Sequence, residues 1–397
     1  DVTISGSIFA QCTSLVKVVL PETVTEVPNA AFQGCSLLKD ITFEGGYTKI
    51  GNSGFAGTAY TEFEVPETVE SISNSAFSNM PNLKKLVINC YLPKIVLGLC
   101  ANDAALEEIV LQPGYTDIFS TAFQGCSSLK SFVVAEGCVT IGNKAFSDCT
   151  SLEEVTLPST FKTGNNNMFK NCTSLKKIYL NSKEAVNWQA GQTVTYKAFA
   201  GVDSVEIIAS ADSYFASSND GIIYSADYKQ IEYVFDNPTA YVDGFYTMRS
   251  EVESIVKRAF MGQKMTGMAL SENLKEIGDY AFDSAAITEL NIPASLEVIG
   301  AFAFQSCKAL TTLTFAENSN LTTIKRAAFY SCGITEVNLP DSLITIEDGK
   351  GTKEGAFSLN PITKVTFGKN LEHIGNYSFC NDSVTKWTTT IREVDLS

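Results

Sequence analysis

The fold is decided by the stretch KAFSDCTSLEEVTLP, residues 144–158, because a close copy, NMFKNCTSLKKIYL, follows at residues 167–180. The two copies are offset by 23 residues, and both carry a phenylalanine at the same place. The same sequence pattern recurs before and after this pair. In each copy we call the residue equivalent to Phe146 the marker. The markers are Phe9, Phe32, Phe55, Phe77, Cys100, Phe123, Phe146, Phe169, Phe199, Phe260, Phe282, Phe304, Phe329, Phe357 and Phe379. A recurrent unit of this length is typical of a stacked repeat protein.

Each unit is predicted to contribute one short strand and one inward phenylalanine. Segments such as LKKLVI at residues 83–88 and LTTLTF at 310–315 alternate apolar and outward residues with the period of a strand. A second apolar pair followed by glycine, as in Ile141-Gly142, predicts a tight corner. We expect the Ala-Phe pair after it to form one helical or 3-10 turn whose phenylalanine fills the axis. One unit cannot bury its own apolar face, so neighbouring units must stack.

Composition excludes several classes of function. The chain has 397 residues, with 29 Lys and Arg against 44 Asp and Glu, which gives a formal net charge of −15. Such a charge repels phosphate backbones and anionic lipids, and no basic run offsets it, so we predict no nucleic-acid partner. No stretch approaches the roughly 18 consecutive apolar residues of a membrane helix, so we predict no transmembrane segment in the given chain.

The line Ile-Gly-x-x-Ala-Phe-x-x-Cys-x-x-Leu-x-x-Val-x-Leu-Pro, as it stands at residues 141–158, resembles the BspA-type leucine-rich repeat, which is related to the Treponema type. The marker spacing predicts about 15 turns, most of 22–25 residues. The resemblance implies an α/β repeat fold, a right-handed leucine-rich-repeat solenoid with short strands on its concave face and short helical or 3-10 turns elsewhere. It also implies an extracellular or bacterial cell-surface protein that adheres to a protein or glycan.

The period breaks between Phe199 and Phe260, where six of the 15 tyrosines gather. We therefore predict an N-terminal repeat array at residues 1–210, a Tyr-rich hairpin interruption at 211–246 and a C-terminal array at 247–397. Two interpretations of the interruption stay open. Its rings pack across strands to join the arrays, or Tyr224, Tyr228 and Tyr233 form a platform that stacks on a sugar or peptide.

Chemistry-bearing residues are sparse. His373 is the one histidine, and there is no Gly-x-Ser-x-Gly elbow and no Cys-x-x-Cys pair. We predict no enzymatic activity, no metal site and no cofactor. Seven of the 11 cysteines lie three residues after a marker and so form columns. Neighbouring turns are close enough for a disulfide, but small buried thiols fit the parallel side chains of a stack better.

Outward strand positions line up as columns on the sheet, and repeat proteins use such surfaces for binding. The candidate partner-binding residues on this face are Lys85, Glu108, Val87, Val110, Val133 and Tyr179. Three successive valines predict an apolar strip beside charges, although valine is also simply a good strand former. The sequence predicts a non-catalytic surface protein that binds a protein or glycan. The alternative is a structural spacer that presents another domain.

Overall fold

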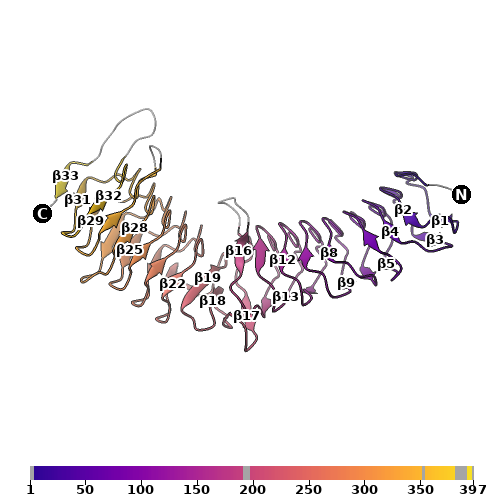
Figure 1. The fold of residues 1–397 in the computed structure, drawn as a ribbon, viewed down its shortest axis with the longest axis horizontal. Helices are drawn as coiled ribbons and strands as arrows, with labels where there is room; N and C mark the ends of the chain where they lie inside the picture. The colour runs from indigo at the N-terminus through magenta and orange to yellow at the C-terminus, as the bar shows by residue number, and fades with distance from the viewer. Residues whose placement is uncertain (1–3, 191–196, 351–353, 381–390, 396–397) are drawn as a thin grey trace. The chain divides into compact units, whose positions relative to one another are not determined.

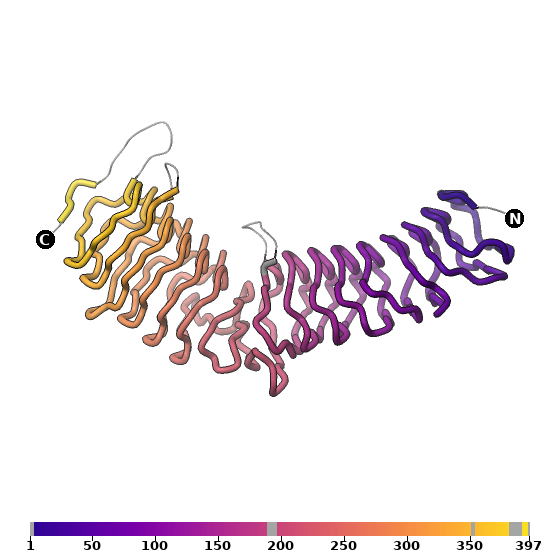
Figure 2. Tube along the Cα trace, in the orientation of Figure 1, coloured from indigo at the N-terminus to yellow at the C-terminus, as the bar shows by residue number. Residues whose placement is uncertain are grey.

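The computed structural model describes residues 4–190, 197–350, 354–380 and 391–395. It divides into two compact units, Asp1–Phe215 and Ala216–Ser397, with the boundary inside the segment that interrupts the repeat. Each unit is a solenoid of parallel strands in which successive turns lie side by side (Figures 1 and 2). The chain forms about 14 turns, close to the 15 expected from the marker residues.

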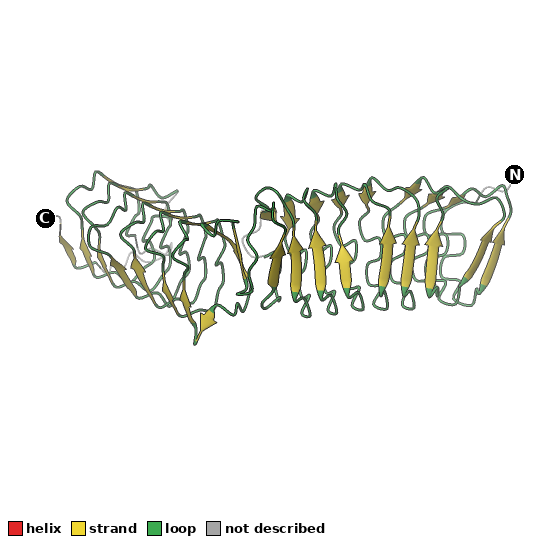
Figure 3. Ribbon diagram, turned by 90° about the horizontal axis from the view of Figure 1, so that it is seen from below, coloured by secondary structure: helices red, strands yellow, loops and turns green. Residues whose placement is uncertain are grey.

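The first unit has a longer and a shorter strand in most turns (Figure 3). The longer strands are β1 (Lys17–Leu20), β3 (Asp40–Phe43), β5 (Glu62–Val65), β7 (Lys85–Ile88), β9 (Glu108–Leu111), β11 (Ser131–Val133), β13 (Glu154–Leu157), β15 (Lys177–Leu180) and β17 (Glu206–Ala209). The second strands of these turns, of two or three residues except for the four-residue β16, are β2 (Glu26–Val27), β4 (Lys49–Ile50), β6 (Ser71–Ile72), β8 (Lys94–Ile95), β10 (Asp117–Ile118), β12 (Thr140–Ile141), β14 (Thr163–Asn165) and β16 (Asn187–Ala190).

The second unit begins with two antiparallel pairs and continues as a parallel stack. The antiparallel pairs are β18 (Ile222–Tyr224) with β19 (Gln230–Val234) and β20 (Tyr241–Val242) with β21 (Phe245–Thr247). The longer strands are β23 (Gly267–Ala269), β25 (Glu289–Ile292), β27 (Thr312–Phe315), β29 (Glu336–Asn338), β31 (Lys364–Thr366) and β33 (Glu393–Asp395). The shorter strands are β22 (Ser254–Ile255), β24 (Glu276–Ile277), β26 (Val298–Ile299), β28 (Thr323–Ile324), β30 (Thr345–Ile346) and β32 (His373–Ile374).

The strands pair with the repeat length as their offset, so equivalent residues lie side by side. Between β13 and β15, Glu154 pairs with Lys177 and Thr156 with Tyr179. Side chains alternate across a strand, so Val155 between the two outward residues is buried. The period-two strands predicted from the sequence are therefore confirmed.

The marker phenylalanines form the core of each unit. Phe146 and Phe169 are fully buried with ring centroids 5.1 Å apart, and Phe304 and Phe329 show the same separation. Burying one such side chain contributes about 1.5–3 kcal/mol, and a stacked ring pair adds roughly 0.5–1.5 kcal/mol. The predicted inward position of the markers is confirmed.

The predicted helical turn at the Ala-Phe pair is wrong, because the described residues contain no helix. Lys144 and Asp148 have positive φ angles of 57° and 65°, which interrupt any helical run. Successive backbone amides donate alternately within their own turn and to the next turn. Ser147 N donates to Lys144 O in the same turn, whereas Phe146 N donates to Met168 O of the next turn at 2.8 Å. Bonds of the second kind consume the donors that an α-helix needs. The α/β description is thus corrected to a solenoid of strands and turns.

The glycine after each apolar pair allows neighbouring turns to approach closely. A Cβ atom built on Gly142 would lie 2.6 Å from the backbone nitrogen of Ser120, which belongs to the preceding turn. Real Cβ atoms do not come so near to backbone, so a side chain here would push the turns apart. The predicted corner at Gly142 is present, and its glycine is required by packing between turns.

All eleven cysteines are free. The buried column thiols donate to the marker carbonyl of the preceding turn, as Cys149 Sγ does to Phe123 O at 3.2 Å and Cys172 Sγ to Phe146 O at 3.1 Å. Burial raises the pKa of Cys149 to about 12, so its thiol stays protonated and unreactive. Of the two interpretations of these columns, the structure supports small buried thiols.

Candidate partner-binding site

Val87, Val110, Val133 and Tyr179 occupy outward positions of β7, β9, β11 and β15. Val133 is 70% exposed and Val110 38%, whereas Val87 and Tyr179 are half-buried. Val87 stands directly beside Val110 in the paired strands β7 and β9. Tyr179 lies away from them, beside Thr156.

The ladder of longer strands is interrupted between Val110 and Val133. Strand β9 ends the sheet β5-β7-β9, and β11 begins the sheet β11-β13-β15-β17, so each presents an unpaired edge (Figure 3). A cavity of about 420 Å³ lies at this place. Most of its lining is apolar, namely Ile109, Val110, Leu111, Phe132, Val133 and Ala135, and Glu107, Glu108, Tyr115 and Ser131 complete it. We call it the aliphatic cleft.

Tyr115 lies where the ladder opens. It stands in the corner after β9, at a position that is aliphatic or cysteine in most turns of the first unit and aromatic again at Tyr47 and Phe161. The equivalent residues include Val24, Val69, Leu92 and Cys138. The buried ring of Tyr115 also lines the cleft. Bulk alone does not open the ladder, because Phe161 occupies the same corner after β13 and β13 still pairs with β15. Tyr115 differs from Phe161 by its hydroxyl group.

The Tyr115 hydroxyl replaces a ladder bond that this separation removes. In a regular turn the amide after the strand donates back to the last strand residue of the turn before, as Asn89 N does to Val65 O at 3.0 Å. Ala135 is the equivalent residue here, and its amide donates to the Tyr115 hydroxyl at 2.9 Å. Burial raises the pKa of Tyr115 to about 12, so the hydroxyl remains neutral.

Charges at the rim of the aliphatic cleft are paired with one another. Lys85 Nζ lies 2.9 Å from Glu108 Oε2, and Lys84 Nζ lies 3.4 Å from Glu107 Oε1. The hydrogen bond to Glu108 raises the pKa of Lys85 above its ordinary value. The two predicted charged residues therefore neutralise each other beside an apolar cleft.

The tyrosine platform predicted for the hairpin is wrong for two of its three members. Tyr224 and Tyr233 are 0% and 1% exposed, so their rings cannot stack on a ligand. Tyr228 is half-buried and its hydroxyl donates to Ser217 O at 2.9 Å. Arg249 lies over the ring of Tyr228 at 4.8 Å from its centroid. Tyr224 packs on Tyr228 and Tyr233 on Phe235, so these rings pack against one another within the second unit.

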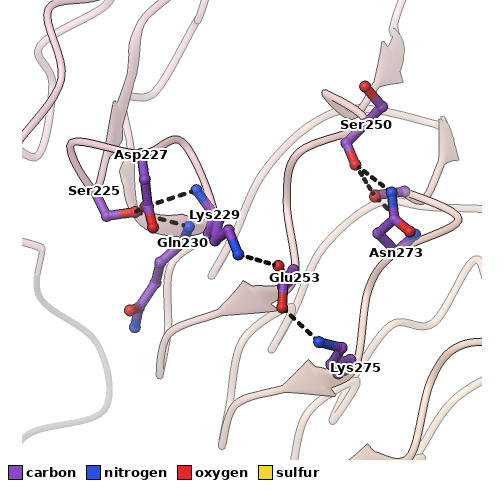
Figure 4. A network of polar contacts seen from close by, with 9 residues as sticks. Ser225, Asp227, Lys229, Gln230, Ser250, Glu253, Asn273 and Lys275 are labelled. Atoms are coloured by element: carbon purple, nitrogen blue, oxygen red, sulfur yellow. Dashed lines mark hydrogen bonds and ion pairs between the residues drawn. The ribbon is translucent and has the colours of Figure 1, made fainter.

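Polar contacts beside the hairpin fix its loop rather than form a site (Figure 4). Asp227 Oδ1 accepts from Ser225 Oγ at 2.7 Å and from Lys229 N at 3.1 Å. Glu253 bridges Lys229 and Lys275, with both ion pairs at 2.6 Å. Hydrogen bonds from these two lysines lower the pKa of Glu253 to about 2. Every charge in this network is therefore matched inside the second unit.

Other candidate chemistry is sparse in the described ranges. They contain no group of three or more His, Cys, Asp or Glu side chains that could hold a metal ion. They also contain no helix of the length and apolar character that crosses a membrane. His373 is 49% exposed and lies 3.6 Å from Asp348, and no nucleophile completes a triad with them in the parts that the structure describes.

The sequence pattern pointed to Val110 and Val133 but not to Tyr115, which lines the cleft between them. A signal was present, because Gly-Tyr-Thr occurs in this chain at residues 46–48 and 114–116. Both copies place tyrosine where the other turns of the first unit have a smaller or non-hydroxylated side chain. A change in one column of a repeat thus marks a local departure from regular stacking.

Comparison with known proteins agrees with this architecture. Residues 2–102, 95–219, 232–351 and 350–394 match the family model described as the BspA type leucine rich repeat region. A leucine-rich repeat protein from Bacteroides ovatus is similar in structure, with 21% identity, a TM-score of 0.50, and 86% of this chain and 83% of that chain covered. No curated protein sequence matches the chain significantly.

Two further solved structures share the repeat with lower structural agreement. A leucine rich cell surface protein from Faecalibacterium prausnitzii has 17% identity and a TM-score of 0.36, with 99% of this chain and 82% of that chain covered. The pneumococcal vaccine antigen PcpA has 19% identity and a TM-score of 0.42, with 96% of this chain and 84% of that chain covered.

Proposed function

Because the chain belongs to the BspA-type leucine-rich repeat family, we propose that it is a non-catalytic cell-surface binding protein that engages a protein partner through its strand face. Proteins built from such repeats are typically binding scaffolds, and stacked strands give them a broad surface. The observation that carries the proposal is the aliphatic cleft between β9 and β11.

The cleft suits a polypeptide better than a glycan. Its walls are the apolar side chains Val110 and Val133 and the unpaired edges of two strands. An extended peptide can add its backbone hydrogen bonds to such an edge while its side chains contact the valines. A sugar instead needs exposed aromatic faces and unpaired polar groups. Here Tyr115 and Phe132 are buried, and the charges at the rim are already paired.

The test compares two valines in the same column of the strand face. The full chain is screened against immobilised proteins and glycans, and Val133→Lys is compared with Val19→Lys. Val19 is 52% exposed on β1, which pairs regularly with β3, so it is a matched control. We expect Val133→Lys to weaken protein binding by at least about tenfold, because a buried charge at an interface centre is costly.

Val19→Lys is expected to bind like the unmodified chain. Equal binding by all three proteins would place the partner outside the cleft. Binding to glycans alone would contradict a protein partner. Circular dichroism of each variant confirms that the solenoid is intact.

A further inference from the structure

The ladder of the first unit opens a second time, between β3 and β5. A cavity of about 390 Å³ lies at this opening, and we call it the aromatic cleft. Half of its lining consists of aromatic residues, namely Phe43, Tyr47, Phe55, Tyr60 and Phe63. The cavity is therefore large enough for a side chain or small ligand and offers several ring surfaces.

Two substitutions in the repeat build this aromatic lining. Tyr47 occupies the corner position that holds Val24 and Val69 in the turns on either side. Tyr60 occupies the place before the strand that is leucine in other turns, as at Leu38 and Leu83. Both rings add bulk to one opening, and Tyr60 and Phe63 stand edge to face at 4.8 Å.

Tyr47 lines the aromatic cleft, and its hydroxyl has no hydrogen-bond partner among the described residues. Tyr47 is only 9% exposed. The residue equivalent to Ala135 is Pro66, which lines the cavity and has no amide hydrogen to donate. A hydroxyl without a protein partner on a residue that lines a cavity is available to a ligand.

Two carboxylates add negative charge to the same cavity. Glu62 and Glu64 line it from outward positions of β5, and none of the residues lining it is basic. Lys85 stands beside Glu62 in the strand register, but its ammonium group pairs with Glu108. Glu64 accepts one hydrogen bond, from Asn89 at 2.7 Å. The carboxylates of Glu62 and Glu64 thus give the cavity a net negative charge beside its aromatic rings.

We propose that the aromatic cleft binds an arginine side chain presented by a partner protein. A guanidinium group is planar and stacks on aromatic faces. It donates five hydrogen bonds, which suit the carboxylates of Glu62 and Glu64 and the free lone pairs of the Tyr47 hydroxyl. The alkyl stem contacts the rings, whereas an anionic group is repelled. This inference does not depend on the aliphatic cleft.

The experiment titrates the full chain with Nα-acetyl-arginine amide and follows binding by calorimetry. Nα-acetyl-citrulline amide is the neutral probe of equal shape, and methyl glucoside tests for a sugar. We expect the arginine probe to bind in the millimolar range, at least about tenfold more tightly than the citrulline probe. Binding should weaken as salt is raised.

Two variants connect this binding to the cleft. Glu62→Gln with Glu64→Gln changes only exposed side chains and should weaken arginine binding by at least about tenfold. Tyr47→Val restores the side chain of neighbouring turns and should weaken binding by at least about tenfold, because it removes one aromatic wall and the hydroxyl acceptor. Tyr115→Val alters the other opening and should leave arginine binding unchanged.

Several outcomes overturn the proposal. They are equal binding of the arginine and citrulline probes, binding of methyl glucoside alone, unchanged binding in the double glutamine variant, and no saturable binding up to about 20 mM arginine probe. The partner screen on Val133→Lys is independent of all four, so failure of either idea is distinguishable from failure of the other.

Discussion

Each of the two clefts of the first unit follows a corner tyrosine. Their linings share an isoleucine, a tyrosine and a phenylalanine at equivalent positions and differ at the others. Tyr47 and Tyr115 occupy equivalent corners, and each is followed by an opening in the ladder of longer strands. Position by position, the aromatic cleft has Phe43, Tyr60, Glu62 and Glu64 where the other opening has Leu111, Leu129, Ser131 and Val133. A corner tyrosine therefore lines both an acidic cavity rich in aromatic residues and a mainly aliphatic cavity whose charged residues are paired.

The comparison shows that a neighbouring turn decides what the tyrosine hydroxyl does. Ala135 donates its amide to Tyr115, so that hydroxyl is satisfied inside the protein. Pro66 stands at the same place beside Tyr47 and has no amide hydrogen, so that hydroxyl remains open to a ligand. The ligand-facing character of Tyr47 thus depends on a proline 19 residues further along the chain.

The largest expected effect concerns a further difference between the two turns. Asp103 occupies, in the turn of β9, the column position that Cys35 holds in the turn of β3. It is fully buried, its Oδ1 accepts from Met80 N at 2.7 Å, and its Oδ2 has no hydrogen-bond partner in the described structure. Burial raises its pKa to about 9, so the folded protein keeps a proton that the unfolded chain releases.

The raised pKa of Asp103 makes the folding stability depend on pH. Above about pH 4 the unfolded chain binds fewer protons than the folded one, so stability falls as pH rises from about 4 to 9. Asp103→Asn keeps the acceptor for Met80 and removes the titration. We expect the variant to be more stable by a few kcal/mol at about pH 8, with a flatter pH profile, measured by urea unfolding. Parallel profiles for the two proteins between about pH 5 and 8.5 would falsify a protonated Asp103.

A smaller effect separates the two tyrosines directly. Tyr115→Phe leaves the part-buried amide of Ala135 without its acceptor and should cost about 1–2 kcal/mol. Tyr47→Phe removes a hydroxyl that has no protein partner and should change stability by less than about 0.5 kcal/mol. Both are measured by chemical unfolding under the same conditions. A loss at Tyr47 equal to that at Tyr115 contradicts the assignment of an open hydroxyl.

The smallest effect tests whether the proline causes the difference. Pro66→Ala supplies an amide hydrogen that the Tyr47 hydroxyl can accept. In that background Tyr47→Phe should become destabilising, with a coupling energy of about 1 kcal/mol in a double-mutant cycle. A coupling near zero would mean that Pro66 does not control the hydroxyl. The unfolding measurements of the single variants supply the other corners of the cycle.

Sequence periodicity predicted the parts of the fold that depend on one unit repeating. Phe146 and Phe169 recur at a fixed spacing, so both had to lie on one axis, and Val155 had to face the core opposite Glu154. The helical turn was predicted wrongly, because the partner of Phe146 N is Met168 O in the next turn. Local propensity does not report a hydrogen bond supplied by a neighbouring turn.

Strand periodicity also predicted part of the candidate site. Val110 and Val133 followed from strand alternation, which places them outward. The burial of Tyr224 and Tyr233 could not be predicted in this way, because the pairing of β18 with β19 shifts register between Ile223 and Tyr224. In a hairpin that leaves the repeat, the sequence has no period from which to infer the inward face.

The sequence by itself determined a stacked repeat with a phenylalanine core, because an apolar pattern that recurs at one spacing can be buried only by its neighbours. Tertiary structure decided where the stack opens and what each opening holds. Whether Tyr47 or Tyr115 faces a ligand depends on Pro66 and Ala135, each contributed by the following turn. The physical reason is that hydrogen bonds and packing between turns, unlike the repeat itself, join residues that no local pattern connects.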